Sequence, residues 1–588
     1  LSYISGVTVL GTPAEVYFFG TQYWVILVGI ACMGVTVAFV YLPVFLQLQI
    51  SSSYQYLELR FNSAVRTAAC VLFIIDELLF LPIVLYVPSL AFNQVTGVGL
   101  HLIGSIVCAV CIFYTSVGGL KAVVWTDTLQ ILLMFFSVIL VIVIGTINIG
   151  GVGEVWKRAS DGGRLQLWNF DPNPLERHTF WSLVIGGYIY WTAFNSVNQT
   201  MVQRYLALPN LRQAQAAMGM FTAGILIFLS FCCFAGVLIY ATYYDCDPLS
   251  AKMIKAEDQL LPLYVMQTTH YILGIPGLFI AGVFSAALSS LSTVLNSTTA
   301  VIMTDILEPV CHCKLTGIWK SVLARGLVIV LGLISIGCLF IVEHLGSVLQ
   351  VVYTLGAIAA GTSFGVFSLG ILFPWANTKG ALTGAIAGAT LIGWISIGSQ
   401  AAVASGKLAP EKLPLSVEGC STVKDEFSVQ YFNVSPVMEP LSYSTFSSPT
   451  PHPHVSRSED DVFVLYKLSY QWLTPLGFCT VMVVGLIVSF CTGGCDEEKL
   501  NPDLFTPLVR NWLLRRRRQR EEAGETKEPV GDGELDREVY SVEFIPMDER
   551  HVNANGSSHV ISANVDETAG LINKTSHRFF LLALSDLI

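Results

Sequence analysis

The chain has 588 residues, of which 53% are hydrophobic and only 13% are charged. Soluble domains carry about 25% charged residues, so this composition and a mean hydropathy of +0.62 exclude a soluble globular protein. The apolar runs are long and continuous, which predicts an all-α polytopic membrane protein. The net charge of −10 is spread over loops and tail and indicates no nucleic-acid partner.

Twelve apolar segments follow one another along the chain. The first, residues 1–12, starts inside an apolar run, and we therefore expect the true N-terminus to be missing; Gly11-Thr12-Pro13 predicts a break at its end. Further membrane spans are predicted, to within a few residues, at 20–48, 65–90, 98–117, 121–148, 179–205, 213–241, 271–306, 319–343, 348–374, 378–401 and 467–491.

The first and sixth spans both contain residues that interrupt helices. Gly11 and Pro13 lie in the first, and Gly186-Gly187 with Asn195 and Asn198 lie in the sixth. A single Gly is better explained by close helix packing, but matching interruptions are typical of transporters built from inverted repeats. The prediction is two inverted five-helix repeats, at 1–148 and 179–374, with broken first and sixth helices.

The remaining segments are assigned from length and charge. Short basic connections alternate with longer loops, and the basic ones are expected to be cytoplasmic. This rule places the start of the N-terminal repeat and the C-terminal tail on the cytoplasmic side of a plasma membrane. The assignments are an extracellular loop at 149–178, an additional helix at 375–401, an extracellular loop at 402–466, a last helix at 467–491 and a disordered tail at 492–588.

The two longer loops carry possible covalent modifications. Cys246 and Cys420 are isolated cysteines in polar loops on the predicted extracellular side, where disulfides persist, and we predict that they pair. The alternative is two free thiols. The sequon Asn433-Val434-Ser435 predicts glycosylation at Asn433, although Pro436 follows it.

The segment 281–308 combines the length of a membrane span with a stripe of small polar residues. These recur at three- and four-residue steps and share one helix face: Ala286, Ser289, Ser290, Thr293, Asn296, Ser297 and Ala300. Such a face is explained either by helix packing or by a cation site of hydroxyl and carbonyl oxygens. Spacing alone favours packing.

Three sequence blocks together resemble the sodium:solute symporter family, which shares the fold of LeuT. They are GGLKAVVWTDTLQ at 118–130, VNQTMVQRYLA at 197–207 and FSAALSSLSTVLNST at 284–298. The resemblance covers roughly residues 1–400 and the last span. Within the family, YLELRFN at 56–62, DGGRLQLWNFDPNPLERHTFW at 161–181 and IPGLFIAGVFS at 275–285 resemble sodium-coupled monocarboxylate and multivitamin transporters.

The resemblance implies a sodium site and reverses the preference for packing. The positions that match the family's ligands are the carbonyl oxygens of Leu1, Ile4 and Ala286 and the hydroxyls of Ser289 and Ser290. A second cation position of some members matches Asp127, expected near Ser290. The alternative for Asp127 is a salt bridge with Lys121 at the end of the span.

The resemblance also limits the substrate. Where sugar-transporting members hold sugar-binding polar groups, this chain has Leu27, Gln259 and Tyr353, and the acid and the lysine are missing. A small carboxylate fits better, because unwound helices offer N–H groups at the positive ends of their dipoles. The candidate substrate-binding residues are Thr8, Gly11, Asn198, Gln259 and Tyr353.

The predicted function is a sodium-coupled secondary active symporter that imports small organic anions, specifically monocarboxylates, by alternating access. The same scaffold could instead carry iodide or a vitamin acid such as biotin or pantothenate, or serve as a membrane sensor without transport. An enzyme is not expected, because the sequence contains no nucleophile–base arrangement and no Walker-type loop. Expected partners are sodium ions, the anion and the lipid bilayer.

Overall fold

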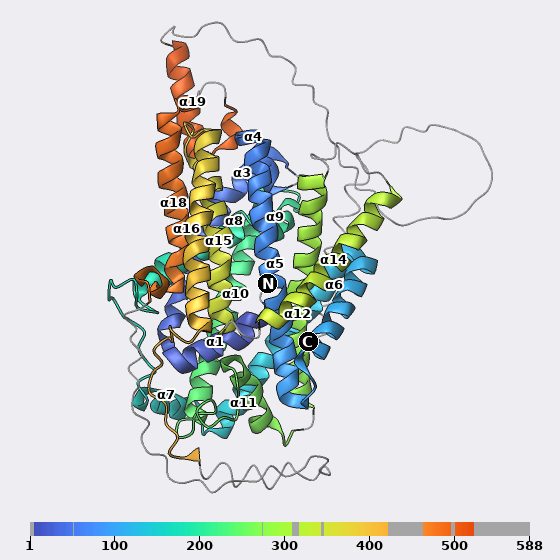
Figure 1. Cartoon of the computed structure of the whole chain (residues 1–588), viewed down its shortest axis with the longest axis vertical. Coiled ribbons are helices and arrows are strands. Elements are labelled where there is room, and N and C mark those ends of the chain that lie inside the picture. The colour runs from blue at the N-terminus through green and yellow to red at the C-terminus, as the bar shows by residue number, and fades with distance from the viewer. Residues whose placement is uncertain are drawn as a thin grey trace, which may run out of the picture. The chain divides into compact units, whose positions relative to one another are not determined.

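The computed structural model describes residues 5–50, 52–272, 274–307, 317–342, 346–420, 462–495 and 500–522, without the side chains of 117–124 and 521–522 (Figure 1). Three predicted site residues, Leu1, Ile4 and Asn433, lie outside this part of the chain. The regular elements of the described residues are all helical. This agrees with the all-α prediction.

Nine helices in the described part of the chain are long and apolar enough to cross a membrane. They are Thr21–Leu48 (η1, α2, η2 and α3), Ser63–Thr96 (α5), Trp125–Asn148 (within α6), Leu211–Thr242 (α10), Ile275–Leu307 (α12 and η5), Ile318–Val342 (α14), Val348–Leu372 (α15), Thr378–Ala404 (α16) and Tyr470–Cys491 (α18). The three other predicted spans correspond to shorter or interrupted helices. These are α1 (Gly6–Phe19), the apolar stretch Leu100–Ser116, and the pair α8 (Gly187–Ser196) and α9 (Gln199–Leu206).

The predicted position of the break in the first span is wrong. Helix α1 starts at Gly6, after an extended Ser5, and continues through Gly11 and Pro13 to Phe19. The proline removes one backbone donor, but α10 packs closely on this turn. A Cβ atom added to Gly236 of α10 would lie 2.6 Å from the carbonyl oxygen of Pro13. This packing supports a continuous helix where the local sequence alone favours a break.

The fourth and fifth predicted spans form one helix. Helix α6 runs from Leu100 to Asn148 without interruption, so the predicted connection between 117 and 121 is helical. At 1.5 Å per residue its 49 residues extend about 74 Å, more than twice the thickness of a bilayer core. Glycine is tolerated inside a helix at a cost near 1 kcal/mol per residue, so Gly118-Gly119 does not enforce a break.

The sixth predicted span is interrupted at Asn198, as predicted. Helix α8 ends at Ser196 and α9 begins at Gln199, and the Asn198 side chain accepts a hydrogen bond from the backbone N–H of Thr200. Gly186 and Gly187 have a different role. Added Cβ atoms there would lie 2.4 Å from the Gln471 carbonyl oxygen and 2.6 Å from Ile26, so both glycines permit close helix packing.

Helix α12 lies at the centre of the bundle and is the most buried of the nine spans (Figure 1). It packs against α5, α6 and α14, while α15, α16 and α18 pack against one another. Helix α1 packs on α10 and also contacts α15 and α5. This arrangement places α1, α5, α8 and α15 around one interior space.

A group of loops covers the end of the bundle that carries α7 (Val152–Asp161) and α11 (Leu260–Thr269) (Figure 1). Cys246 and Cys420 are joined by a disulfide, with Cα atoms 4.8 Å apart. The fully buried guanidinium of Arg164 donates to the carbonyl oxygens of Tyr17 and Pro414 at 3.0 and 2.8 Å. Buried backbone carbonyls need donors, and Arg164 thereby ties three distant segments together.

The prediction of a disordered tail at 492–588 is wrong for residues 500–522. Helix α19 (Pro507–Glu522) follows a 3₁₀ turn at Pro502–Leu504. Phe505 and Leu513 are buried, and the guanidinium of Arg60 lies 5.2 Å from the Phe505 ring. These two apolar side chains are buried, although the mostly polar composition of the segment gave no indication that it would pack. Residues 523–588 lie outside the described part of the chain.

Candidate functional site

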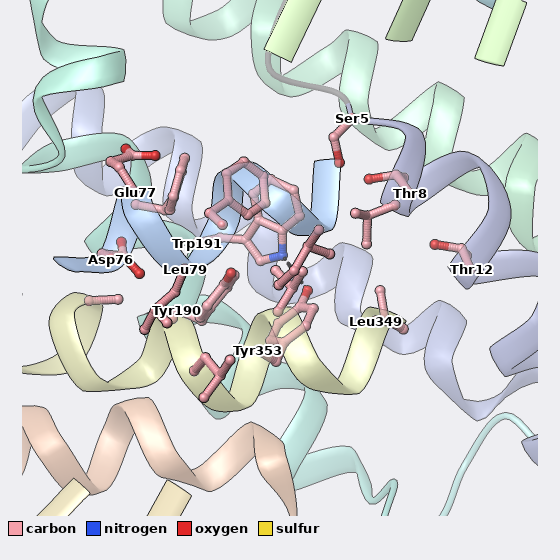
Figure 2. Close-up of a pocket in the computed structure, with 18 of the residues that line it drawn as sticks. Ser5, Thr8, Thr12, Asp76, Glu77, Leu79, Tyr190, Trp191, Leu349 and Tyr353 are labelled. Atoms are coloured by element: carbon pink, nitrogen blue, oxygen red, sulfur yellow. Dashed lines mark hydrogen bonds between the residues drawn. The ribbon is translucent and has the colours of Figure 1, made fainter. Parts of the chain in front are cut away.

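A cavity of about 70 Å³ lies between α1, α5, α8 and α15 (Figure 2). Its wall is mostly apolar, with hydroxyls, carboxylates and aromatic rings at separate places. A few polar groups in an apolar pocket are typical of a small-molecule site. The polar and aromatic residues that line it are Ser5, Thr8, Thr12, Tyr23, Asp76, Glu77, Phe80, Tyr190, Trp191, Phe194 and Tyr353.

One side of the cavity is formed by hydroxyl groups of α1 and the residue before it. Ser5, Thr8 and Thr12 line it, and Figure 2 shows them together. The Thr12 side chain is fully buried, and its hydroxyl has no hydrogen-bond partner in the described residues. An unpaired buried hydroxyl is unfavourable by about 1–3 kcal/mol, so Thr12 is a candidate ligand contact.

The middle of the cavity has an aromatic wall. The rings of Tyr190 and Tyr353 stack with centroids 4.2 Å apart. The indole N–H of Trp191 donates to the Tyr353 hydroxyl at 3.2 Å, and the Tyr23 hydroxyl lies 3.3 Å from the same oxygen. These hydrogen bonds fix the Tyr353 ring at the cavity.

Two adjacent carboxylates of α5, Asp76 and Glu77, line the side opposite the α1 hydroxyls (Figure 2). Glu77 is almost completely buried and its Oε1 accepts hydrogen bonds from Asn198 at 3.3 Å and from Thr200 at 2.9 Å. The Thr200 hydroxyl also lies 2.8 Å from that of Ser297 on α12. A chain of hydrogen bonds therefore connects the cavity with the central helix.

The small polar face of α12 lies in the interior, where Ala286, Ser289 and Ser290 are all buried. The Ser289 hydroxyl donates to Oδ1 of Asp127 at 2.8 Å. The Ser290 hydroxyl has no hydrogen-bond partner in the described residues. The structure thus brings Asp127 to the predicted sodium-site serines.

Asp127 has a cationic neighbour that the sequence analysis did not name. A guanidinium nitrogen of Arg204 on α9 lies 3.3 Å from its Oδ2 and donates to the Thr293 hydroxyl at 2.6 Å. The predicted alternative partner, Lys121, has a side chain outside the described atoms. Asp127 therefore lies between a hydroxyl of α12 and a cation of α9.

The predicted substrate residues fall into two groups. Thr8 and Tyr353 line the cavity. Gly11 lies against α15, where a Cβ atom added to it would lie 3.2 Å from the Cβ atom of Leu349. Asn198 is connected to this cavity by the hydrogen bond that its side chain donates to Glu77. Gln259 accepts hydrogen bonds from the backbone N–H groups of residues 255 and 256, so its amide oxygen stabilises a loop.

The sequence predictions did not include the acidic pair, and of the aromatic wall they included only Tyr353. Adjacent Asp76 and Glu77 inside a 34-residue apolar helix are a signal visible in the sequence, since acids in membrane spans are rare and usually functional. Tyr23, Tyr190 and Trp191 have no comparable signal, because aromatic residues are common in every span of this chain.

A second buried polar cluster lies near the end of α1. Glu15 receives two hydrogen bonds from the Arg177 guanidinium, at 2.6 and 2.9 Å, and its Oε1 lies 3.1 Å from His178 Nε2. Burial alone would lower the pKa of Arg177, but the Glu15 carboxylate raises it above its usual value. Burial lowers the pKa of His178 and thereby favours its neutral form.

Asp258, in the 3₁₀ turn Glu257–Gln259, is an acid with only one partner at this same end. Its Oδ2 accepts a hydrogen bond from the backbone N–H of Val348 at 3.1 Å, while Oδ1 has none in the described residues. Burial raises the pKa of Asp258 to about 7, although the Val348 N–H acts in the opposite direction.

Residues 1–388 match the family model described as "Sodium:solute symporter family". The chain is 38% identical over 506 residues to sodium-coupled monocarboxylate transporter 1 of Mus musculus, covering 85% of this chain and 80% of that protein. It is 37% identical over 514 residues to the sodium-dependent multivitamin transporter of Oryctolagus cuniculus, covering 87% and 77%.

A solved structure of a Na⁺-coupled sialic acid symporter, in a substrate-bound outward-open state, shares the fold. Its TM-score is 0.62 at 21% identity, with 84% of this chain and 88% of the other covered. This likeness and the all-helical bundle show a LeuT-like fold. The matched family model and the relatives above 30% identity lead to one conclusion: the chain belongs to the sodium:solute symporter family.

Proposed function

We propose that this protein is a sodium-coupled symporter that imports small monocarboxylates by alternating access. The observation that carries the proposal is the buried, unpaired hydroxyl of Ser290 beside Ser289 and Asp127, within a bundle that also holds a small polar-lined cavity. The relatives named for sodium-coupled monocarboxylate transport support the substrate class.

Sodium is the co-transported ion. The proposed ligands in the described residues are the carbonyl oxygen of Ala286 and the hydroxyls of Ser289 and Ser290, with Leu1 and Ile4 as the further candidates. A buried hydroxyl without a partner is unfavourable, and a hard cation would satisfy it with ion–oxygen contacts. Asp127 is the candidate for a second cation, with Arg204 as its present neighbour.

The cavity is proposed as the carboxylate site. The hydroxyls of Ser5, Thr8 and Thr12 can donate hydrogen bonds to an anionic group. The cavity volume is small, about 70 Å³. This volume favours a molecule the size of pyruvate over one the size of biotin.

The proposed location is the plasma membrane. The Cys246–Cys420 disulfide favours an extracellular position for the loops at 242–270 and 402–466, because disulfides persist outside the cell. The basic segment at 515–518 favours a cytoplasmic position for the tail. Glycosylation at Asn433 is a further expectation of this orientation.

Uptake into cells that express the full-length protein tests the proposal. We expect sodium-dependent uptake of labelled pyruvate that exceeds uptake of nicotinate, biotin and iodide, with choline replacing sodium as the control. Uptake of biotin or iodide alone would assign the protein to another substrate. Specific binding of pyruvate without any uptake would instead indicate a sensor.

A further inference from the structure

The acidic pair Asp76 and Glu77 lies deep in α5, thirteen and fourteen residues after the first residue of that helix, Ser63. Both carboxylates line the proposed substrate cavity (Figure 2). An ionised group in a membrane interior is unfavourable unless it is paired. Acids that occur there are therefore rare and usually have a function. Two neighbouring acids beside a carboxylate site would also repel a simple organic anion.

The two carboxylates have no cationic partner in the described residues. Glu77 receives neutral donors, from Asn198 and Thr200, on one oxygen. Asp76 receives no hydrogen bond from the described residues, and none of the described residues that line the cavity is Lys, Arg or His. This end of the cavity therefore carries two carboxyl groups with no basic side chain beside them among the described lining residues.

An aromatic ring lies next to the same carboxylates. Oδ1 of Asp76 and the hydroxyl of Tyr190 each lie 3.7 Å from the point where a Cβ of Gly356 would be, so both groups meet at this glycine. The Tyr190 ring is stacked on Tyr353 at 4.2 Å. A carboxyl oxygen and a tyrosine hydroxyl at one place can both accept hydrogen bonds from an ammonium group.

The opposite end of the cavity has complementary chemistry. There the buried Thr12 hydroxyl has no hydrogen-bond partner among the described residues, and Ser5 and Thr8 line the same side. Figure 2 shows these hydroxyls on one side, the aromatic residues in the middle and the acidic pair on the other side. The cavity thus has hydroxyl donors at one end and carboxyl groups at the other.

We propose that, among small monocarboxylates, the preferred substrate is a zwitterion that also carries an ammonium group, which Asp76 and Glu77 bind beside Tyr190. This inference rests on the proposed function, because it places the carboxylate at the α1 hydroxyls. The inference adds a second, positively charged group to the substrate. The ammonium group supplies the positive charge that the described residues lining this end do not provide.

Matched pairs of substrates test this inference in the full-length protein. Acetate and glycine, propionate and β-alanine, and butyrate and 4-aminobutyrate differ mainly by the amino group. We expect sodium-dependent uptake of at least one amino compound to exceed that of its partner at least tenfold. Asp76→Asn should lower this ratio at least tenfold, since it removes the charge and keeps the shape.

Glu154→Gln is the matched control, because Glu154 lies on α7, outside the cavity, and should leave the ratio unchanged. If Asp76→Asn does not reach the surface, the wild-type ratios still decide. Uptake of propionate or pyruvate in preference to every amino compound would overturn this inference and leave the proposed function intact. Absence of sodium-dependent uptake of both members of every pair and of pyruvate would overturn both.

Discussion

Two acids in the interior of this protein, the buried Glu15 and the partly exposed Asp76, differ in what surrounds them. Glu15, near the end of α1, is held by two hydrogen bonds from Arg177 and lies next to His178. Asp76, on α5, faces the cavity and receives no hydrogen bond from the described residues. Both occupy the interior of the same bundle, but among the described residues only Glu15 has a cationic partner.

This difference separates structural acids from candidate binding acids. A buried carboxylate that is fully paired stabilises one arrangement of its neighbours, and removing its partner is strongly unfavourable. A carboxylate that faces a cavity without a partner leaves its charge available to a ligand. The comparison therefore predicts opposite outcomes when charges are removed at the two places.

The largest effect is expected from Arg177→Met, which leaves Glu15 buried without its cation. We expect a loss of about 3–5 kcal/mol in the free energy of unfolding, measured by thermal unfolding in detergent. Arg158→Met, at a half-exposed pair with Glu154, should have a much smaller effect. Equal losses in the two variants would contradict a structural role for the Glu15 cluster.

The next effect concerns the loops that cover this same end of the bundle. Cys246→Ser should lower stability by about 2–4 kcal/mol, because the disulfide closes a loop of 174 residues. Cys420→Ser and the double variant should show the same loss, since one bond is removed in each case. Cys479→Ser, at an exposed free thiol, is the control. Additive losses in the double variant would exclude a shared bond.

The serines of α12 extend the comparison from acids to hydroxyls. Ser289→Ala and Ser290→Ala should each raise the sodium concentration for half-maximal uptake about tenfold or more, because a bond to a charged group contributes about 1.5–3 kcal/mol. Ser292→Ala removes a buried hydroxyl that donates to the Ser289 carbonyl oxygen and serves as the control. Unchanged sodium dependence in both ligand variants would favour simple helix packing.

The smallest expected effect is the pH dependence from Asp258. Its folded pKa of about 7 lies above the ordinary value of 3.8, so its contribution to stability is greatest below pH 4 and is lost as the pH rises through 7. Asp258→Asn should remove a difference of about 1–3 kcal/mol between pH 5 and pH 8. If the free energy of unfolding depends on pH in the same way in Asp258→Asn and in the wild type, a cation compensates the Asp258 carboxylate.

Much of the fold could be predicted because membrane spans are long apolar runs. The interruption at Asn198 was also predictable, since its side chain satisfies the first turn of α9. The continuity of α1 through Pro13 was not, because it depends on packing against Gly236 of another helix. The same reason explains residues 500–522, where Phe505 packs under Arg60.

Only the part of the site that lies on a single helix could be predicted from the sequence. The stripe with Ser289 and Ser290 follows from helical spacing, and the structure brings Asp127 to it. The cavity instead combines residues from α1, α5, α8 and α15, and periodicity does not tell which faces of different helices meet. Gln259 was assigned to the substrate site from the family resemblance alone. In this structure its amide oxygen instead accepts a hydrogen bond from a loop backbone N–H.

The short helix α9 connects the two polar centres of the protein. Its first turn, with Thr200, is bonded to Glu77 at the cavity, and its later turn carries Arg204, which contacts Asp127 beside the α12 serines. Eight residues of helix extend about 12 Å, and a helix of this length moves as a rigid rod. Any displacement of α9 would therefore alter contacts at both centres, with Glu77 at the cavity and with Asp127 beside the α12 serines.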